Sequence, residues 1–301
     1  MGELKNPKLA IPVVLMSGIF WSFGPYVVRN IDQAHTVPWQ YLFTRGLVIF
    51  ILLNLYLYLE EGLSFISNYK KIGISGIVGG VGLAFAMITF IWSITNTSAA
   101  ITLLCLASMP FITALLGFLF LKETISINVW VAIGIATLGI IIMAFGNHEK
   151  NTLIGFILGI VSAVGFSVFS VSLRWRKETP KFTTVALSGF ICFAVASIII
   201  LTNDMNFLST SYNGTLFSLH GVLVCMGLIL YSIGSKAIPA AELTLLSLTE
   251  VIGGIFWVWL PLFGINEVPS SNTIVGGFFL FLSLFYYSLI MRWNKRYIAL
   301  N

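Results

Sequence analysis

Runs of apolar residues long enough to cross a lipid bilayer recur along the 301-residue sequence. A transmembrane helix needs about 20 such residues. The runs fall at roughly 9–29, 37–58, 72–94, 97–121, 127–145, 152–175, 181–201, 215–235, 239–263 and 272–292. Because the hydrocarbon core offers no water to the backbone, each run should be helical. The pattern predicts an all-α integral membrane protein with ten transmembrane helices.

Composition agrees with a membrane location. Hydrophobic residues make up 58% of the chain and charged residues only 9%, which is too little polar surface for a water-soluble globule. Of the 16 Lys and Arg residues, only Arg29 and Lys150 lie on the side opposite the N-terminus, and Arg45 lies within a span. This bias predicts both termini in the cytoplasm and the protein in the inner membrane. The net charge of +5 therefore reflects orientation, and no nucleic-acid partner is expected.

A degenerate repeat relates the two halves of the chain. The stretch at 98–126 returns at 239–270, with Ala99-Ala100 matching Ala240-Ala241 at a spacing of 141 residues. The same spacing matches three glycines with three others, namely Gly18 with Gly159, Gly24 with Gly165 and Gly80 with Gly221. Five helices separate the copies, so the second copy crosses the membrane in the opposite sense. We expect two inverted five-helix repeats, residues 1–147 and 148–301, an arrangement typical of transporters.

Several of these residues resemble one transporter family. The motifs are the two Ala-Ala starts, Pro110, the Lys122-Glu123-Thr124 ending with its counterpart Glu267, Phe20-Trp21-Ser22, and Arg45. They resemble the EamA-like permeases of the drug/metabolite transporter (DMT) superfamily. The resemblance implies a ten-helix basket whose cavity is walled by helices 1, 3, 4, 6, 8 and 9. It also implies transport of amino acids, nucleosides or other small metabolites, often outward. Val251 replaces Pro110 in the second copy, so a kink shared by both copies is not predicted for helix 9.

Three ionisable side chains lie well inside predicted spans: Arg45, Glu242 and Glu250. Glu250 lies about 16 Å from the cytoplasmic end and Arg45 about 12 Å from the outer end, so the two share one depth. We interpret Glu250 as the residue that holds a cationic group of the substrate or a coupling proton. The alternative is a structural tie to a neighbouring helix through Arg45. Arg45 itself is expected to be structural, because the resemblance places helix 2 outside the cavity wall. Glu242, near the cytoplasmic end, either reaches water or gates the site.

Helical spacing suggests a pocket with aromatic walls and few hydroxyl groups. The predicted substrate-binding residues besides Glu250 are Trp21, Ser22, Tyr26, Phe166, Tyr231, Leu246 and Trp257. On helix 9, Glu242, Leu246, Glu250 and Trp257 should share one face. His220 is a second candidate for proton coupling. Ordinary helix packing is the alternative interpretation for each of these side chains.

The sequence contains no catalytic or metal-binding motif that we recognise, so neither an enzyme nor a cofactor is predicted. We predict a secondary transporter that moves a small amphipathic metabolite, such as an amino acid or related amine, by alternating access, with export expected. The alternatives are a membrane-embedded lipid-modifying enzyme, a lipid or drug flippase of the same architecture, and a structural scaffold. The expected partners are a small-molecule substrate and the lipid bilayer, and the protein should be a monomer or homodimer.

Overall fold

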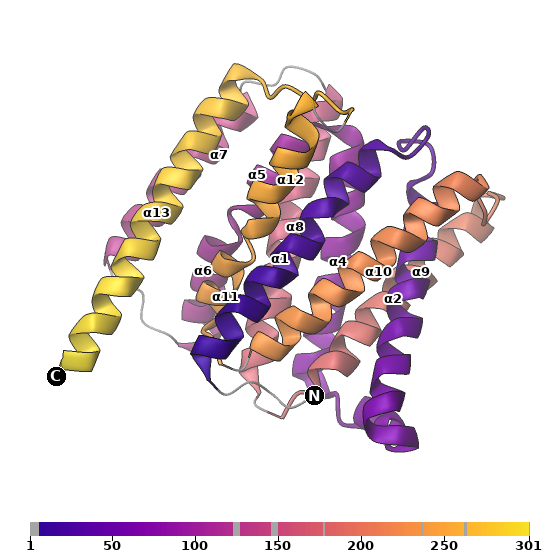
Figure 1. The fold of residues 1–301 in the computed structure, drawn as a ribbon, viewed down its shortest axis with the longest axis horizontal. Coiled ribbons are helices and arrows are strands. Elements are labelled where there is room, and N and C mark those ends of the chain that lie inside the picture. The colour runs from indigo at the N-terminus through magenta and orange to yellow at the C-terminus, as the bar shows by residue number, and fades with distance from the viewer. Residues whose placement is uncertain are drawn as a thin grey trace.

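The computed structural model describes residues 6–122, 127–145, 150–176, 178–235, 237–261 and 264–300, which form helices and connecting loops without a strand (Figure 1). The helices are α1 (Pro7–Arg29), α2 (Pro38–Glu61), α3 (Ile66–Lys70), α4 (Gly73–Asn96), α5 (Ala99–Leu106), α6 (Met109–Leu121), α7 (Ile127–Phe145), α8 (Lys150–Trp175), α9 (Lys181–Thr202), α10 (Ser211–Gly234), α11 (Ala240–Leu246), α12 (Thr249–Trp259) and α13 (Ser271–Leu300), with one 3-10 turn, η1 (Gly62–Phe65). The Glu123-Thr124 part of the family motif and the predicted boundary at 147/148 lie outside these residues.

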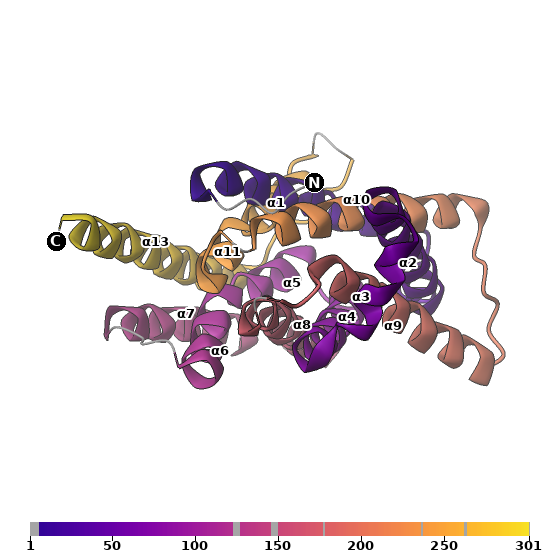
Figure 2. The same cartoon turned by 90° about the horizontal axis from the view of Figure 1, so that it is seen from below.

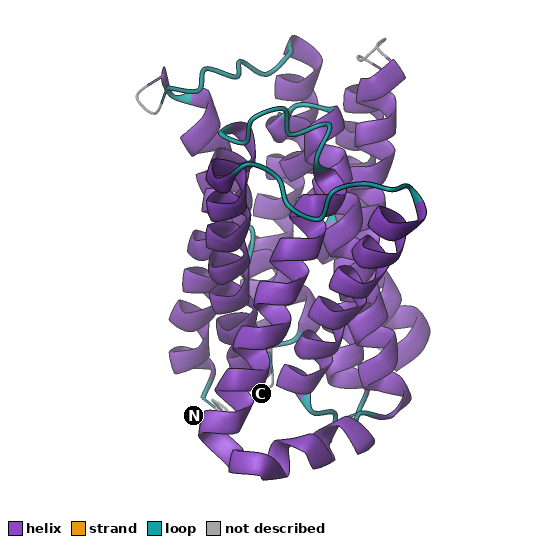
Figure 3. Cartoon of the chain, turned by 90° about the vertical axis from the view of Figure 1, so that its right-hand side faces the viewer, coloured by secondary structure: helices purple, strands orange, loops and turns teal. Residues whose placement is uncertain are grey.

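The prediction of an all-α membrane protein is confirmed. In the described ranges, eight helical stretches are long and apolar enough to span a bilayer, counting α5 with α6 and α11 with α12. Shorter apolar stretches, Trp130–Met143 and Ser271–Tyr287, lie in α7 and α13. The helices run roughly along one direction, with the loops at the two ends of the bundle (Figure 3). α1 begins and α13 ends at the same end (Figures 1 and 3).

The helices pack in pairs across the bundle. α7 and α13 form one edge and α2 and α9 the opposite edge, with the remaining long helices between them (Figure 2). α4 packs on α8 and α9, and α10 packs on α1 and α2. Two glycines allow parts of this packing. A Cβ added at Gly80 of α4 would lie 3.2 Å from the Thr184 carbonyl of α9, and one at Gly221 of α10 would lie 3.4 Å from Arg45 Cα of α2.

The predicted helix 4 is interrupted at Ala107 and Ser108, between α5 and α6. Ser108 N donates to the Cys105 carbonyl at 3.1 Å, a tighter 3-10-type bond, and Ser108 Oγ donates to the same carbonyl at 2.6 Å. Pro110 follows in the first turn of α6, where its missing N–H costs little. The proline therefore accounts for the end of the first helical segment.

The predicted helix 9 is interrupted in the same way, which corrects the expectation drawn from Val251. The break falls at Ser247 and Leu248, within one residue of the position that the 141-residue spacing gives. Leu248 N donates to the Leu245 carbonyl at 3.2 Å, and Ser247 Oγ donates to the Thr244 carbonyl at 2.8 Å. The serine hydroxyl and the 3-10-type bonds thus end α11 without a proline.

A network around Arg29 fastens the end of the bundle opposite the start of α1. Arg29 Nε donates to Glu267 Oε2 at 2.6 Å, and its two terminal nitrogens donate to the carbonyls of Ile94 and Thr97 at 2.7 and 2.8 Å. Glu267 Oε1 accepts from the Ala99 backbone N–H at 2.6 Å. The network joins the end of α1, the α4–α5 connection and the segment before α13.

Candidate binding cavity

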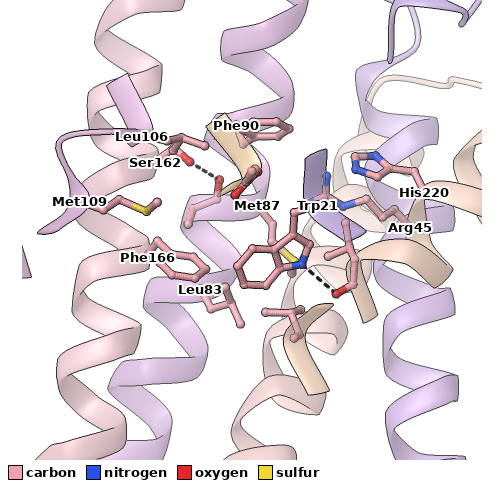
Figure 4. A pocket seen from close by; sticks show the side chains of 14 residues that line it. Trp21, Arg45, Leu83, Met87, Phe90, Leu106, Met109, Ser162, Phe166 and His220 are labelled. Carbon is pink, nitrogen blue, oxygen red and sulfur yellow. Dashed lines mark hydrogen bonds between the residues drawn. The ribbon is translucent and has the colours of Figure 1, made fainter. Parts of the chain in front are cut away.

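A cavity of about 70 Å³ lies where both interrupted helices meet the centre of the bundle. Side chains from α1, α2, α4, α5, α6, α8, α10 and α12 line it (Figure 4). Its lining residues are Trp21, Arg45, Leu83, Ala86, Met87, Phe90, Leu106, Met109, Ser162, Phe166, His220, Val224, Leu228 and Glu250. The volume is below the roughly 300–1,000 Å³ of typical ligand pockets, so it holds a few waters or a small polar group.

Trp21 and Phe166 form an aromatic wall on one side of the cavity (Figure 4). Their rings meet edge to face with centroids 5.6 Å apart, and Tyr231 packs against both. Trp21 Nε1 donates to the Val224 carbonyl at 3.2 Å, which fixes the indole against α10. Gly227 of α10 leaves the space that the indole occupies, because a Cβ there would lie 2.6 Å from Trp21 Cδ1. Helix contacts thus set the position of the wall.

Arg45 reaches from α2 toward the middle of the cavity, between Trp21 and His220 (Figure 4). Its side chain is only 2% exposed, and its Nε and Nη1 atoms make no hydrogen bond. The resemblance implied that helix 2 lies outside the cavity wall, but Arg45 of α2 lines the cavity. Two glycines explain how α2 comes close enough. Gly221 lets α10 approach the backbone of Arg45, and Gly46 lets α9 approach α2.

Glu250 enters the cavity from the first turn of α12. Gly18 on α1 allows this approach, since a Cβ there would lie 3.0 Å from Glu250 N. Thr249 Oγ1 donates to the Leu15 carbonyl at 3.1 Å and fixes the start of α12 on α1. The helix dipole favours a carboxylate at this end by about 0.3–1 kcal/mol. Among the described residues, Glu250 and Arg45 line one cavity without forming an ion pair.

His220 lines the cavity from α10 and is hydrogen-bonded through Nδ1 to the Tyr41 hydroxyl of α2. The Tyr41 ring also stacks on Phe217, with centroids 4.7 Å apart. A Cβ added at Gly24 would lie 2.7 Å from His220 Nε2, so this glycine makes room for the imidazole. The contacts position His220, and its predicted coupling role remains a prediction.

Two predicted residues of α1 lie away from the cavity. Ser22 Oγ donates to the Ile19 carbonyl at 2.7 Å and accepts from Trp257 Nε1 at 3.1 Å. Tyr26 lines a separate apolar groove between α1 and α10 together with Phe23. Ser22 therefore joins α1 to α12, while Tyr26 faces a different surface.

The remaining predicted residues also lie outside the lining. Trp257 stacks on Phe23 with centroids 4.9 Å apart, and Tyr231 is fully buried with its hydroxyl 2.7 Å from Ser170 Oγ. Leu246 ends α11, and Glu242 lies in the first turn of that helix. Of the four residues predicted to share one face of helix 9, only Glu250 lines the cavity, and the break at 247–248 places Glu242 and Leu246 on a separate helical segment.

Several apolar residues that line the cavity from α4, α5 and α6 were not among the residues predicted from the sequence. Leu83, Met87 and Phe90 recur at helical spacing on α4 and line the cavity, as do Leu106 and Met109 beside the first break. These side chains are apolar, and most positions on every helix of a membrane protein are apolar too. Only the assignment of helices 3 and 4 to the cavity wall gave a signal for them.

Comparison with known proteins decides the family. Residues 8–145 match the EamA-like transporter family. A Bacillus subtilis (strain 168) protein named "Uncharacterized transporter YojE" is 24% identical over 277 residues, covering 88% of each chain. Residues 8–145 therefore form an EamA-like transporter domain, and the relative named as a transporter extends the likeness over most of the chain. This EamA-like protein is also 27% identical over 143 residues to an "Uncharacterized transporter" of Helicobacter pylori (strain J99), covering 48% of this chain and 47% of that protein.

A solved crystal structure supports the fold of the EamA-like protein across its length. The two superpose with a TM-score of 0.66 over 95% of this chain and 99% of the other, at 15% sequence identity. That likeness concerns the fold alone. The family and the relatives together identify the chain as a membrane transporter.

Proposed function

We propose that the protein is a secondary transporter that moves a small amphipathic metabolite, such as an amino acid or related amine, by alternating access. The observation that carries this proposal is the central cavity beside two interrupted helices, with Glu250 and an aromatic wall in its lining. Interrupted helices near the bilayer midplane are where secondary transporters bind their cargo. A carboxylate beside aromatic rings suits an ammonium group attached to an apolar body.

The architecture we propose is ten spans arranged as two inverted repeats, 1–147 and 148–301. The packing supports it, because exchanging the halves maps observed contacts onto observed contacts. The α4·α8 contact maps onto α10·α1, the α4·α9 contact onto α10·α2, and the α5·α12 contact onto α11·α6. Two such halves can exchange roles, which opens one central site to each side of the membrane in turn. We also propose cytoplasmic termini in the inner membrane and outward transport, as the charge bias and the family favour.

In this proposal Glu250 binds the cationic group of the cargo or a coupling proton. Glu250 lines the cavity together with Trp21. A charge in the membrane interior costs at least a few kcal/mol unless it is paired or hydrated, so a bound cation would stabilise it.

Transport by purified protein in liposomes tests the proposal. Labelled amino acids and amines should enter liposomes that contain the wild type, and Glu250→Gln should lower the rate at least about tenfold while remaining folded. Glu178→Gln is the matched control, because Glu178 is exposed in the α8–α9 loop. No transport of any solute in a broad metabolite panel would refute the function. Normal transport by Glu250→Gln would refute the role of Glu250.

A further inference from the structure

We propose that Arg45 is an anion-binding subsite, so that the cargo carries a carboxylate as well as an ammonium group. This inference rests on the proposed transport function and narrows its substrate class to zwitterions with an apolar side chain. The charged groups would bind at two separate points, the carboxylate at Arg45 and the ammonium at Glu250.

The first step of the argument is the state of the Arg45 guanidinium. The group is always protonated in proteins, and it presents five N–H donors. Here the side chain is 98% buried, and its Nε and Nη1 atoms have no hydrogen-bond partner. A buried donor without a partner costs about 1–3 kcal/mol, and more when it is charged. A ligand that accepts from these nitrogens would remove that cost.

The second step is the direction of the side chain. Arg45 lines the central cavity and points toward its middle (Figure 4). The Gly221 and Gly46 contacts hold α2 close to α10 and α9, so the guanidinium is placed by the backbone. Each of the two free nitrogens, Nε and Nη1, can donate a charge-assisted hydrogen bond to a carboxylate oxygen. A carboxylate entering the cavity would therefore meet the unpaired nitrogens.

The third step is the charge balance of the cavity. Glu250 lines the same cavity, and it forms no ion pair with Arg45 within the described residues. One fixed cation and one fixed anion accept a zwitterion without leaving a net charge in the membrane interior. A simple amine supplies no acceptor for Nε and Nη1 of Arg45, and a simple acid supplies no cation for Glu250. The lining therefore favours a solute with both charges.

The fourth step concerns the rest of the solute. Trp21, Phe166, Leu83 and Met87 surround the charged groups with apolar surface. The room of about 70 Å³ suits the polar head of a small molecule, and an aliphatic side chain would lie against these residues. This combination points to α-amino acids with apolar side chains, rather than to sugars or inorganic ions.

Three solutes with one carbon skeleton test the subsite: L-leucine, L-leucinamide, which lacks the carboxylate, and 4-methylpentanoate, which lacks the ammonium. Binding to the purified protein is measured by the rise in its melting temperature. Wild-type protein should bind leucine at least about tenfold more tightly than either analogue, the value expected from a charged hydrogen bond. This comparison needs no variant. Equal affinity for leucine and leucinamide would overturn the inference, as would a failure to bind any α-amino acid in a panel of small, aliphatic and aromatic side chains.

Two variants assign the preference to residues. Arg45→Gln should lower leucine affinity to the level of leucinamide and leave leucinamide binding unchanged, whereas Glu250→Gln should weaken both and spare 4-methylpentanoate. Arg45→Lys, which keeps the charge without the planar fork, should retain part of the preference. Arg176→Gln removes an exposed charge and is the control. A folded Arg45→Gln protein that loses leucine and leucinamide equally would mean a structural role. Transport of amines without any dependence on Arg45 would overturn this inference and leave the transport function standing.

Discussion

Substitution of Gly227 by alanine is expected to displace the indole that walls the cavity. The new Cβ would lie 2.6 Å from Trp21 Cδ1 and 2.7 Å from Trp21 Cε2, so the ring must move about 1 Å to reach an ordinary carbon contact. That movement also lengthens the 3.2 Å hydrogen bond from Trp21 Nε1 to the Val224 carbonyl. The substitution therefore acts on the cavity through Trp21, without adding a group to the lining itself.

The size of the effect follows from three terms. Overpacking costs about 1–3 kcal/mol, and loss of the hydrogen bond costs about 0.5–1.5 kcal/mol. Replacing glycine inside a helix returns up to about 1 kcal/mol of helix propensity. The free energy of unfolding should therefore fall by about 1–3 kcal/mol, and affinity for a bound solute should fall about tenfold as the wall shifts.

Thermal melting and solute binding of purified Gly227→Ala measure these two quantities. Gly214→Ala is the matched control, because it lies on the same helix with no atom within 4 Å of the new Cβ and should gain the propensity term alone. Trp21→Phe removes the colliding indole ring, so the double variant should lose less stability than the sum of the single variants. If Gly227→Ala has the same melting temperature as Gly214→Ala and binds solute as tightly as the wild type, the reasoning fails.

Two further substitutions probe other contacts. Glu267→Gln removes the charge that pairs with Arg29, whose side chain is 22% exposed. We expect the free energy of unfolding to fall by about 1–2 kcal/mol, measured by thermal melting. An unchanged melting temperature would mean that the remaining hydrogen bonds of Arg29 suffice. Gly165→Ala places a Cβ 2.7 Å from the Gly82 carbonyl, so it should push α8 away from α4 and lower the free energy of unfolding by about 2 kcal/mol. Gly134→Ala is the control, because no atom lies within 4 Å of its new Cβ and stability should not fall. Equal melting temperatures for the two variants would contradict the packing argument.

Much of the fold could be predicted from the sequence because membrane helices follow from local composition. The apolar runs located the spanning helices to within a few residues, and the repeat anticipated which helices would be equivalent. The sequence did not predict the break at Ser247, because no proline lies near it. A serine hydroxyl that bonds to the preceding turn ends a helix segment as well, yet serine occurs inside many intact helices.

The candidate site was predictable where charge or aromatic character made a residue distinctive. Glu250, Trp21 and Phe166 were named from the sequence and lie in the cavity lining. Arg45 was noticed, but its place in the lining depends on how closely α2 approaches α10 at Gly221, which is a tertiary contact. Trp257 lies two turns beyond Glu250 on α12, where it stacks on Phe23 and donates to Ser22 of α1, and these tertiary contacts are not visible in the sequence.

The two helix breaks differ in what a straightened helix would cost. Pro110 has no N–H to offer the Leu106 carbonyl, so a continuous helix through α5 and α6 carries a penalty of about 3 kcal/mol. The α11–α12 break contains no proline, and every backbone N–H there is available for regular α-helical bonds. The second half is therefore the more compliant hinge, and Glu250 lies beside it. A bending motion concentrated at Ser247 would change the position of the carboxylate while the Pro110 side keeps its shape.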